Sequence, residues 1–149
     1  MRKILLALLV LNSGFCLAMN PMDQANMERL VKSKASQAKG EKGVVEFEYN
    51  SVTMYLISDV NHDRMRIVAP VIEYEKLTKD QIDSVMNSNY HRALDARYAV
   101  SDGILFSVYI HPLSQLSDTQ IDSAIEQVAN LALSFGSQYT SGMLNFGDQ

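Results

Sequence analysis

A ten-residue phrase that occurs twice constrains the fold of this chain more than any other feature. It spans residues 77–86 and returns at 116–125, and both copies contain Gln-Ile-Asp-Ser. In each copy a hydroxyl residue, Thr78 or Ser117, precedes a glutamine by three positions, which is the pattern of a helix capping box. The apolar residues that flank each cap are placed to form a hydrophobic staple. The phrase therefore predicts two helix starts.

The start of the chain has the features of a secretory signal peptide. Arg2 and Lys3 precede an apolar run over 4–10, and the small residues Cys16 and Ala18 occupy the minus-three and minus-one positions of a cleavage site. The run is shorter than the roughly 20 apolar residues that span a membrane. We expect cleavage after Ala18, a periplasmic or secreted protein, and no stable membrane insertion after cleavage. An uncleaved anchor is the alternative.

The sequence that remains after cleavage predicts one acidic domain without cysteine chemistry. Its 131 residues are enough for a single core. The only cysteine lies in the leader, so no disulfide and no thiol site is expected. Residues 44–149 contain six basic and fourteen acidic side chains, which disfavours nonspecific nucleic-acid binding because phosphate contacts need clustered Lys and Arg.

Residues 19–43 are predicted to form an N-terminal helical segment that packs on the domain. Pro21 suits an early helical position and Gly40 a helix stop. Between them, apolar residues recur at near-helical spacing: Met27, Leu30, Val31, Ala35 and Ala38. The five basic and three acidic side chains of this segment are typical of a solvated helix face, although contact with an anionic membrane surface is the alternative.

Apolar and polar residues then alternate from 44 to 69, which is the period of a half-buried strand. Two-residue turns at 50–51 and 61–62 set apolar residues opposite each other in two successive hairpins. The predicted pairs are Tyr49 with Val52, Phe47 with Met54, Val45 with Leu56, Leu56 with Ile67, and Asp59 with Arg64. Pro70 is tolerated only at an edge, a bulge or a strand end, so the third strand bends or ends there.

A second hairpin over 94–111 contains Asp102-Gly103, and its register depends on the length of the loop. We take the apolar row of its last strand, Ile104, Phe106, Val108 and Ile110, as the core row. A two-residue loop would set this row against Ser101, Ala99, Arg97 and Asp95. We predict a three-residue loop that sets Val100 opposite Ile104, with Gly103 in the left-handed region, because the other register would bury Arg97.

The predicted order is helix, three strands, helix, two strands, helix, which is an α+β two-layer domain with an antiparallel sheet of about five strands. The second helix ends near Asn87 or Asn89, and the last runs from Ser117 to about Phe135. The predicted boundaries are 1–18 for the signal peptide, 19–43 for the N-terminal helical segment, 44–136 for the α+β domain and 137–149 for a loose polar tail.

This order resembles the type III secretion chaperone-like fold, and in particular the YbjN-like bacterial sensory-transduction-regulator family. The resemblance covers Met27 to Phe135 and includes the end of the second helix, Met86-Asn87-Ser88-Asn89, which runs into the second hairpin. Members of the broader fold commonly bind protein segments and often dimerise. The resemblance thus implies a protein-binding module. The signal peptide departs from the pattern of secretion chaperones, which act in the cytoplasm.

No pattern in the sequence indicates a reaction. None of the three histidines, His62, His91 and His111, has another histidine at helical ligand spacing, and no nucleophile elbow or phosphate loop is present. An EF-hand-like start at 59–63 lacks the glycine at the sixth position and the glutamate at the twelfth. We therefore expect no catalytic residue, no metal site and no cofactor.

The second face of the predicted sheet supplies the candidate binding site. The predicted registers place Tyr55, Val68, Leu105 and Tyr109 on it, and aromatic and apolar residues concentrate at the centres of interfaces. The alternative is that a helix covers this face. We predict a non-catalytic exported binding module that holds a protein segment or a homodimer partner. A small-ligand carrier with an apolar pocket between the sheet and the helices is the alternative.

Overall fold

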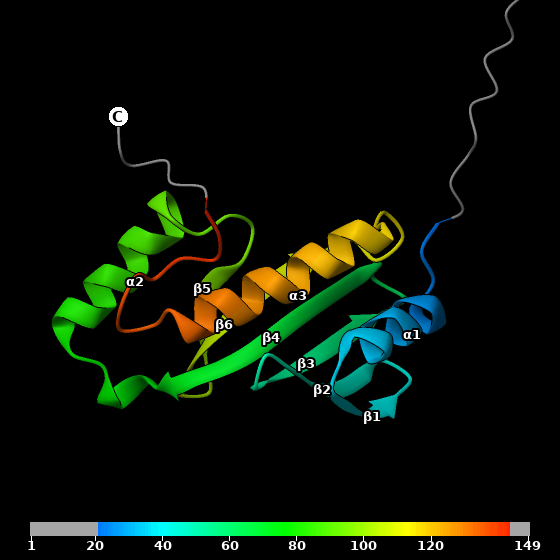
Figure 1. The fold of residues 1–149 in the computed structure, drawn as a ribbon, viewed down its shortest axis with the longest axis horizontal. Coiled ribbons are helices and arrows are strands. Elements are labelled where there is room, and N and C mark those ends of the chain that lie inside the picture. The colour runs from blue at the N-terminus through cyan, green and yellow to red at the C-terminus, as the bar shows by residue number, and fades with distance from the viewer. Residues whose placement is uncertain (1–20, 144–149) are drawn as a thin grey trace, which may run out of the picture.

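Three helices and an antiparallel sheet of six strands make up residues 21–143, the part of the chain that the computed structural model describes. The sheet order is β1-β2-β3-β4-β6-β5, and α1 and α3 lie on one face of the sheet whereas α2 stands beside β5 (Figure 1). The elements are α1 (Gln24–Lys34), β1 (Gln37–Glu41), β2 (Val44–Tyr49), β3 (Val52–Asp59), β4 (Arg64–Glu73), a short 3-10 helix (Tyr74–Lys76), α2 (Lys79–His91), β5 (Arg97–Ser101), β6 (Ile104–His111) and α3 (Asp118–Leu133). The α+β class is confirmed, with one strand more than expected. The predicted signal peptide lies outside the described residues.

Both helix starts are confirmed. At the start of α2, Thr78 Oγ1 accepts from Gln81 N at 3.2 Å, and Gln81 Oε1 accepts from Thr78 N at 3.0 Å. At the start of α3, Ser117 and Gln120 make the same two bonds at 3.2 and 2.8 Å. These reciprocal bonds satisfy backbone N–H groups that a helix start leaves free. The repeated phrase thus has the same local structure twice.

The strand that the sequence analysis missed is β1. The first helix ends at Lys34 and not near Gly40, because Ala35 is already extended. The chain then forms β1 and reverses at Lys42 and Gly43, which both have positive φ, to pair with β2. The predicted boundary between a helical segment over 19–43 and a domain over 44–136 is therefore wrong, since β1 belongs to the sheet.

The first two predicted registers are confirmed. Phe47 faces Met54 across β2 and β3, and Leu56 faces Ile67 across β3 and β4. Near Pro70 the register of β4 against β6 shifts, and the strand then continues to Glu73. This is the bulge that a proline inside a paired strand requires, since proline cannot donate to the ladder.

The predicted register of the second hairpin is wrong. Ser101, not Val100, lies opposite Ile104, and Asp102 and Gly103 form a two-residue turn with φ of 48° and 75°. The expected core row of β6 faces away from the helices, and the alternate residues of that strand are buried instead. Arg97 thus lies on the uncovered face, where its charge stays exposed, and the objection to this register does not apply.

The core lies between the sheet and the two helices α1 and α3. Its largest fully buried side chains come from the sheet and from both helices: Phe47, Met27, Met54, Leu56, Met65, Ile67, Leu105, Ile121, Ile125 and Leu131. The apolar stripe of α3 supplies most of the helical contribution, as its sequence pattern predicts.

The end of the chain, predicted as a loose tail over 137–149, is fastened to the domain as far as it is described. Ser141 is buried, and its Oγ accepts from Leu94 N at 2.6 Å. The Tyr139 carbonyl accepts from Ser88 Oγ of α2. The prediction is therefore wrong for residues 137–142, and residues 144–149 lie outside the described part of the chain.

Candidate functional site

The face of the sheet opposite α1 and α3 carries an apolar surface that helices leave open. Its exposed members include Val44, Ile57 and Ile110, at 54%, 39% and 57% exposure. The sheet registers place these side chains in rows with neighbours from β3, β4 and β6. We define the open-face patch as Val44, Tyr55, Ile57, Val68, Val108 and Ile110.

The structure divides the four predicted binding residues between the two faces. Tyr55 and Val68 lie opposite each other on β3 and β4, half-buried, within the open-face patch. Leu105 and Tyr109 are only 2% and 6% exposed and face the helices on the other side. Burial also raises the pKa of Tyr109. The prediction of one shared face is therefore wrong for Leu105 and Tyr109, because the register of the second hairpin is shifted by one residue, which turns every β6 side chain over.

Residues that the sequence analysis assigned to the core replace them in the patch. Val108 pairs with Val68, and Ile110 pairs with Arg66, which itself lies beside Ile57. The signal that could have found them is the presence of apolar residues on both faces of β6, such as Leu105 beside Ile104, since a strand covered on one face alone normally alternates apolar with polar. An apolar second face on a central strand indicates a contact that the covering helices do not make.

Charges of opposite sign border the open-face patch on two sides. Glu46 of β2 lies opposite Tyr55, whereas Arg97 of β5 lies opposite Val108 at the far end of the same row. The patch therefore has an acidic border and a basic border, and the exposed Arg66 adds a positive charge between Ile57 and Ile110. Apolar side chains with charged neighbours are typical of a protein interface.

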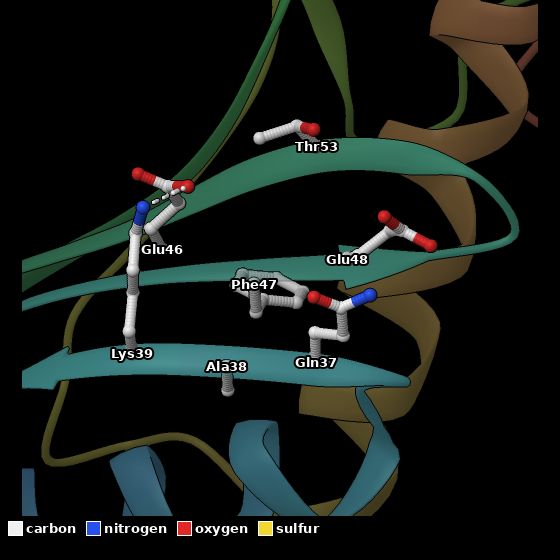
Figure 2. Close-up of a pocket in the computed structure, with 7 residues that line it drawn as sticks. All are labelled: Gln37, Ala38, Lys39, Glu46, Phe47, Glu48 and Thr53. Atoms are coloured by element: carbon white, nitrogen blue, oxygen red, sulfur yellow. Dashed lines mark ion pairs between the residues drawn. The ribbon is translucent and has the colours of Figure 1, made fainter.

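A shallow hollow of about 150 Å³ adjoins the acidic border, beside the outer strand β1. Figure 2 shows Lys39 of β1 and Glu46 of β2 reaching toward each other above the strands, with Nζ and Oε1 2.9 Å apart. The hydrogen bond to Glu46 raises the pKa of Lys39. All five residues of β1 are exposed, and on its outer side no further strand of residues 21–143 pairs with it. An unpaired strand edge therefore meets a polar hollow at this corner.

The three histidines of the described residues lie apart from one another. His62 Nδ1 lies 2.6 Å from Asp59 Oδ2 in an exposed turn, and His111 Nδ1 lies 2.8 Å from the Pro112 carbonyl oxygen. His91 is at the end of α2. Between residues 21 and 143, no three His, Cys, Asp or Glu side chains are close enough to hold a metal ion. In the same range, no helix has the length and apolar character to cross a membrane.

Comparison with solved structures identifies the fold. A chain of the HopA1–SchA chaperone–effector complex aligns with a TM-score of 0.56 at 10% identity, covering 77% of this chain and 98% of that chain. The Yersinia pestis type III secretion chaperone SycH, in complex with a fragment of YscM2, gives 0.56 at 13% identity over 76% and 98%. The ExsC–ExsE complex gives 0.57 at 15% identity over 85% and 99%. The fold is therefore that of type III secretion chaperone structures.

No family model matches the sequence, and no curated protein matches it.

Proposed function

We propose that this chain is an exported, non-catalytic module that binds an extended segment of a partner protein. The observation that carries the proposal is an apolar patch on an uncovered sheet face beside the unpaired edge of β1. A strand edge offers main-chain donors and acceptors to an added strand, and the neighbouring surface then selects its side chains. The partner segment would pair with β1, and adjoining parts of the partner would cover the patch.

The surface around β1 favours a segment with a polar side chain facing the hollow. Lys39 and Glu46 satisfy each other there, and Glu48 accepts from Ser36 Oγ at 3.1 Å. A polar side chain can join these bonds, whereas an apolar one would strip water from them without compensation. Toward the patch, apolar side chains are favoured instead.

The similar structures support the protein-binding part of the proposal. Their descriptions name a chaperone with an effector and a secretion chaperone with a protein fragment. A fold used to hold another protein in those complexes is suited to the same task here. The narrower resemblance to the YbjN-like family stays a prediction.

The packing of the core favours this module over a small-ligand carrier. A carrier needs an apolar cavity of some hundreds of cubic ångströms between the sheet and the helices. That space is filled by fully buried side chains such as Met54, Ile67 and Ile125. Two hollows, of about 150 and 90 Å³, lie among charged side chains at the surface. A third, of about 630 Å³, is an open surface hollow between the end of α3 and residues 137–143, not a space between the sheet and the helices, and most of its lining residues are polar.

The signal-peptide features of residues 1–18 support export. A cut after Ala18 would leave residues 21–143 whole, and the first buried residue among them is Met22, whose N–H donates to the Ser114 carbonyl oxygen at 3.2 Å. Fusion of residues 1–18 to a reporter active only outside the cytoplasm should give signal, and the mature protein should begin at Met19. A purified native protein with its leader intact would contradict the export proposal.

The test of binding is a crosslinking pull-down with a matched pair of variants. The double variant Ile57→Glu with Ile110→Glu places charges in the open-face patch, and Leu133→Glu places one on α3, where Leu133 is 58% exposed. We expect the double variant to lose proteins that both the wild type and the Leu133 variant retain. Mass spectrometry of the eluates identifies them. Equal recovery from all three proteins would contradict a binding role for the patch.

A further inference from the structure

The two edges of the sheet are finished in different ways. At β5, the side-chain amide of Asn89 from α2 takes the place of a neighbouring strand. Asn89 Oδ1 accepts from Tyr98 N at 2.7 Å, and Asn89 Nδ2 donates to the Tyr98 carbonyl oxygen at 3.0 Å. One residue thus satisfies both main-chain groups of Tyr98, as a hydrogen-bonded pair does in an antiparallel ladder. The β1 edge has no comparable cover among the described side chains.

A second side-chain amide covers the approach to β5. Gln127 of α3 is buried, and its Oε1 accepts from Asp95 N at 2.8 Å and from Ala96 N at 3.0 Å. Val100 is the next residue after Tyr98 whose main chain faces this edge, because alternate residues of a strand point the same way. No side chain within residues 21–143 bonds to the Val100 main chain, and Val100 is half exposed. Side-chain hydrogen bonds to the β5 edge therefore end at Tyr98.

The end of the described chain holds the helix that carries Asn89. Ser88 Oγ donates to the Tyr139 carbonyl oxygen, and Arg92 Nη1 donates to the Gln138 carbonyl oxygen at 3.1 Å. Thr140 Oγ1 in turn donates to the Arg92 carbonyl oxygen at 3.2 Å. These bonds flank Asn89 on α2 and fix its distance from β5.

We propose that Asn89 is an edge guard that keeps β5 from pairing with β5 of a second copy of this chain. Identical strands pair antiparallel about a two-fold axis, so each copy offers the other a matching edge. Pairing centred on Ala99 would set Tyr98 opposite Val100 and Arg97 opposite Ser101, so no like charges would meet. While Asn89 occupies the β5 edge, a strand from a partner would pair with β1 instead. This consequence rests on the proposed function.

The test compares Asn89→Ala with Asn87→Ala. Asn87 is on the same helix but is exposed and bonds only within α2, to the Asp83 carbonyl oxygen at 2.9 Å. In the Asn89 variant we expect the Tyr98 amide to exchange its hydrogen about five to ten times faster, the effect of losing one net hydrogen bond. Sedimentation should show a mass that rises with concentration above that of the wild type. The Asn87 variant should show neither change.

Unchanged exchange at Tyr98, an unchanged mass, or equal effects from both variants would overturn the edge guard. If Asn89→Ala does not fold, hydrogen exchange is compared within the wild type. The Tyr98 amide, which is bonded to Asn89, should exchange more slowly than the Val100 amide on the same edge. Equal rates for these two amides would overturn the proposal. Neither readout involves a partner at β1, so failure here and failure of the proposed function are distinguishable.

Discussion

Both faces of the sheet carry apolar side chains, but their surroundings differ. On β4, Ile67 is fully buried beneath the helices, whereas its neighbour Val68 faces the open side and is half-buried. On β6, Tyr109 and Ile110 differ in the same way. Apolar character therefore does not identify the core face of a central strand. The helices decide which face is core, and the face they leave open is available to a partner.

The largest expected effect is the loss of stability caused by a substitution on the covered face. Ile67→Ala should lower the free energy of unfolding by about 2–5 kcal/mol, because it leaves a cavity beneath the helices. Val68→Ala, one residue along on the open face, should cost at most about 1 kcal/mol. Urea unfolding of the two variants measures the difference. Equal losses would mean that the open face is also packed, and the distinction between the faces would fail.

A smaller effect of opposite sign is expected from Ser107, also on the covered face. Its Oγ is buried without a hydrogen-bond partner among the described groups. Removing an unsatisfied hydroxyl relieves its desolvation cost, so Ser107→Ala should raise the free energy of unfolding by up to about 1 kcal/mol. A loss of stability in urea unfolding would show that the hydroxyl has a partner in solution, such as a bound water.

The smallest expected effect is the pH dependence of the connection between the sheet and the loop before α3. Asp63 Oδ1 accepts from Ser114 N at 2.7 Å, and Oδ2 accepts from Ser114 Oγ at 2.8 Å. These bonds hold the pKa of Asp63 below its ordinary value. The carboxylate therefore stabilises the fold above its ordinary pKa of about 4, and this contribution is lost as the pH falls through the folded value.

The measurement is the thermal midpoint of the wild type and of Asp63→Asn between about pH 6 and pH 3. We expect the thermal midpoint of the wild type to fall further than that of the variant as the pH decreases over this range. Asp59 remains in both proteins, and the bonds that His62 makes to it also lower its pKa, so some acid dependence should persist in the variant. Equal slopes would contradict a stabilising role for ionised Asp63.

Local signals in the sequence predicted local structure well. Each capping box involves residues three positions apart, and each of the first two hairpins has one face that is clearly more apolar. Features that depend on tertiary contacts were harder to predict from the sequence. Strand β1 reads Gln-Ala-Lys-Gly-Glu, which has low strand propensity, and it forms because β2 offers a pairing edge.

The candidate site depends on which row of β6 faces the core. The row Ile104, Phe106, Val108 and Ile110 is the more apolar one, yet the helices cover the other row, so hydrophobicity alone selects the wrong face. The predicted register kept Arg97 out of the core on the assumption that Ile104 faces the helices, and this exchanged Leu105 and Tyr109 for Val108 and Ile110. The signal that could have corrected the choice is the pair Asp102-Gly103, which is typical of a two-residue turn.

The most direct test of the central claim is a photocrosslink from the β1 edge. A photoreactive residue at Gln37, which is exposed on β1, is compared with one at Gln138, which is exposed beyond α3. In a cell that exports the protein, the account predicts a crosslinked partner from position 37 and none from position 138. The crosslink should also disappear in the Ile57→Glu with Ile110→Glu background. A partner captured equally from both positions, or from position 138 alone, would contradict the account.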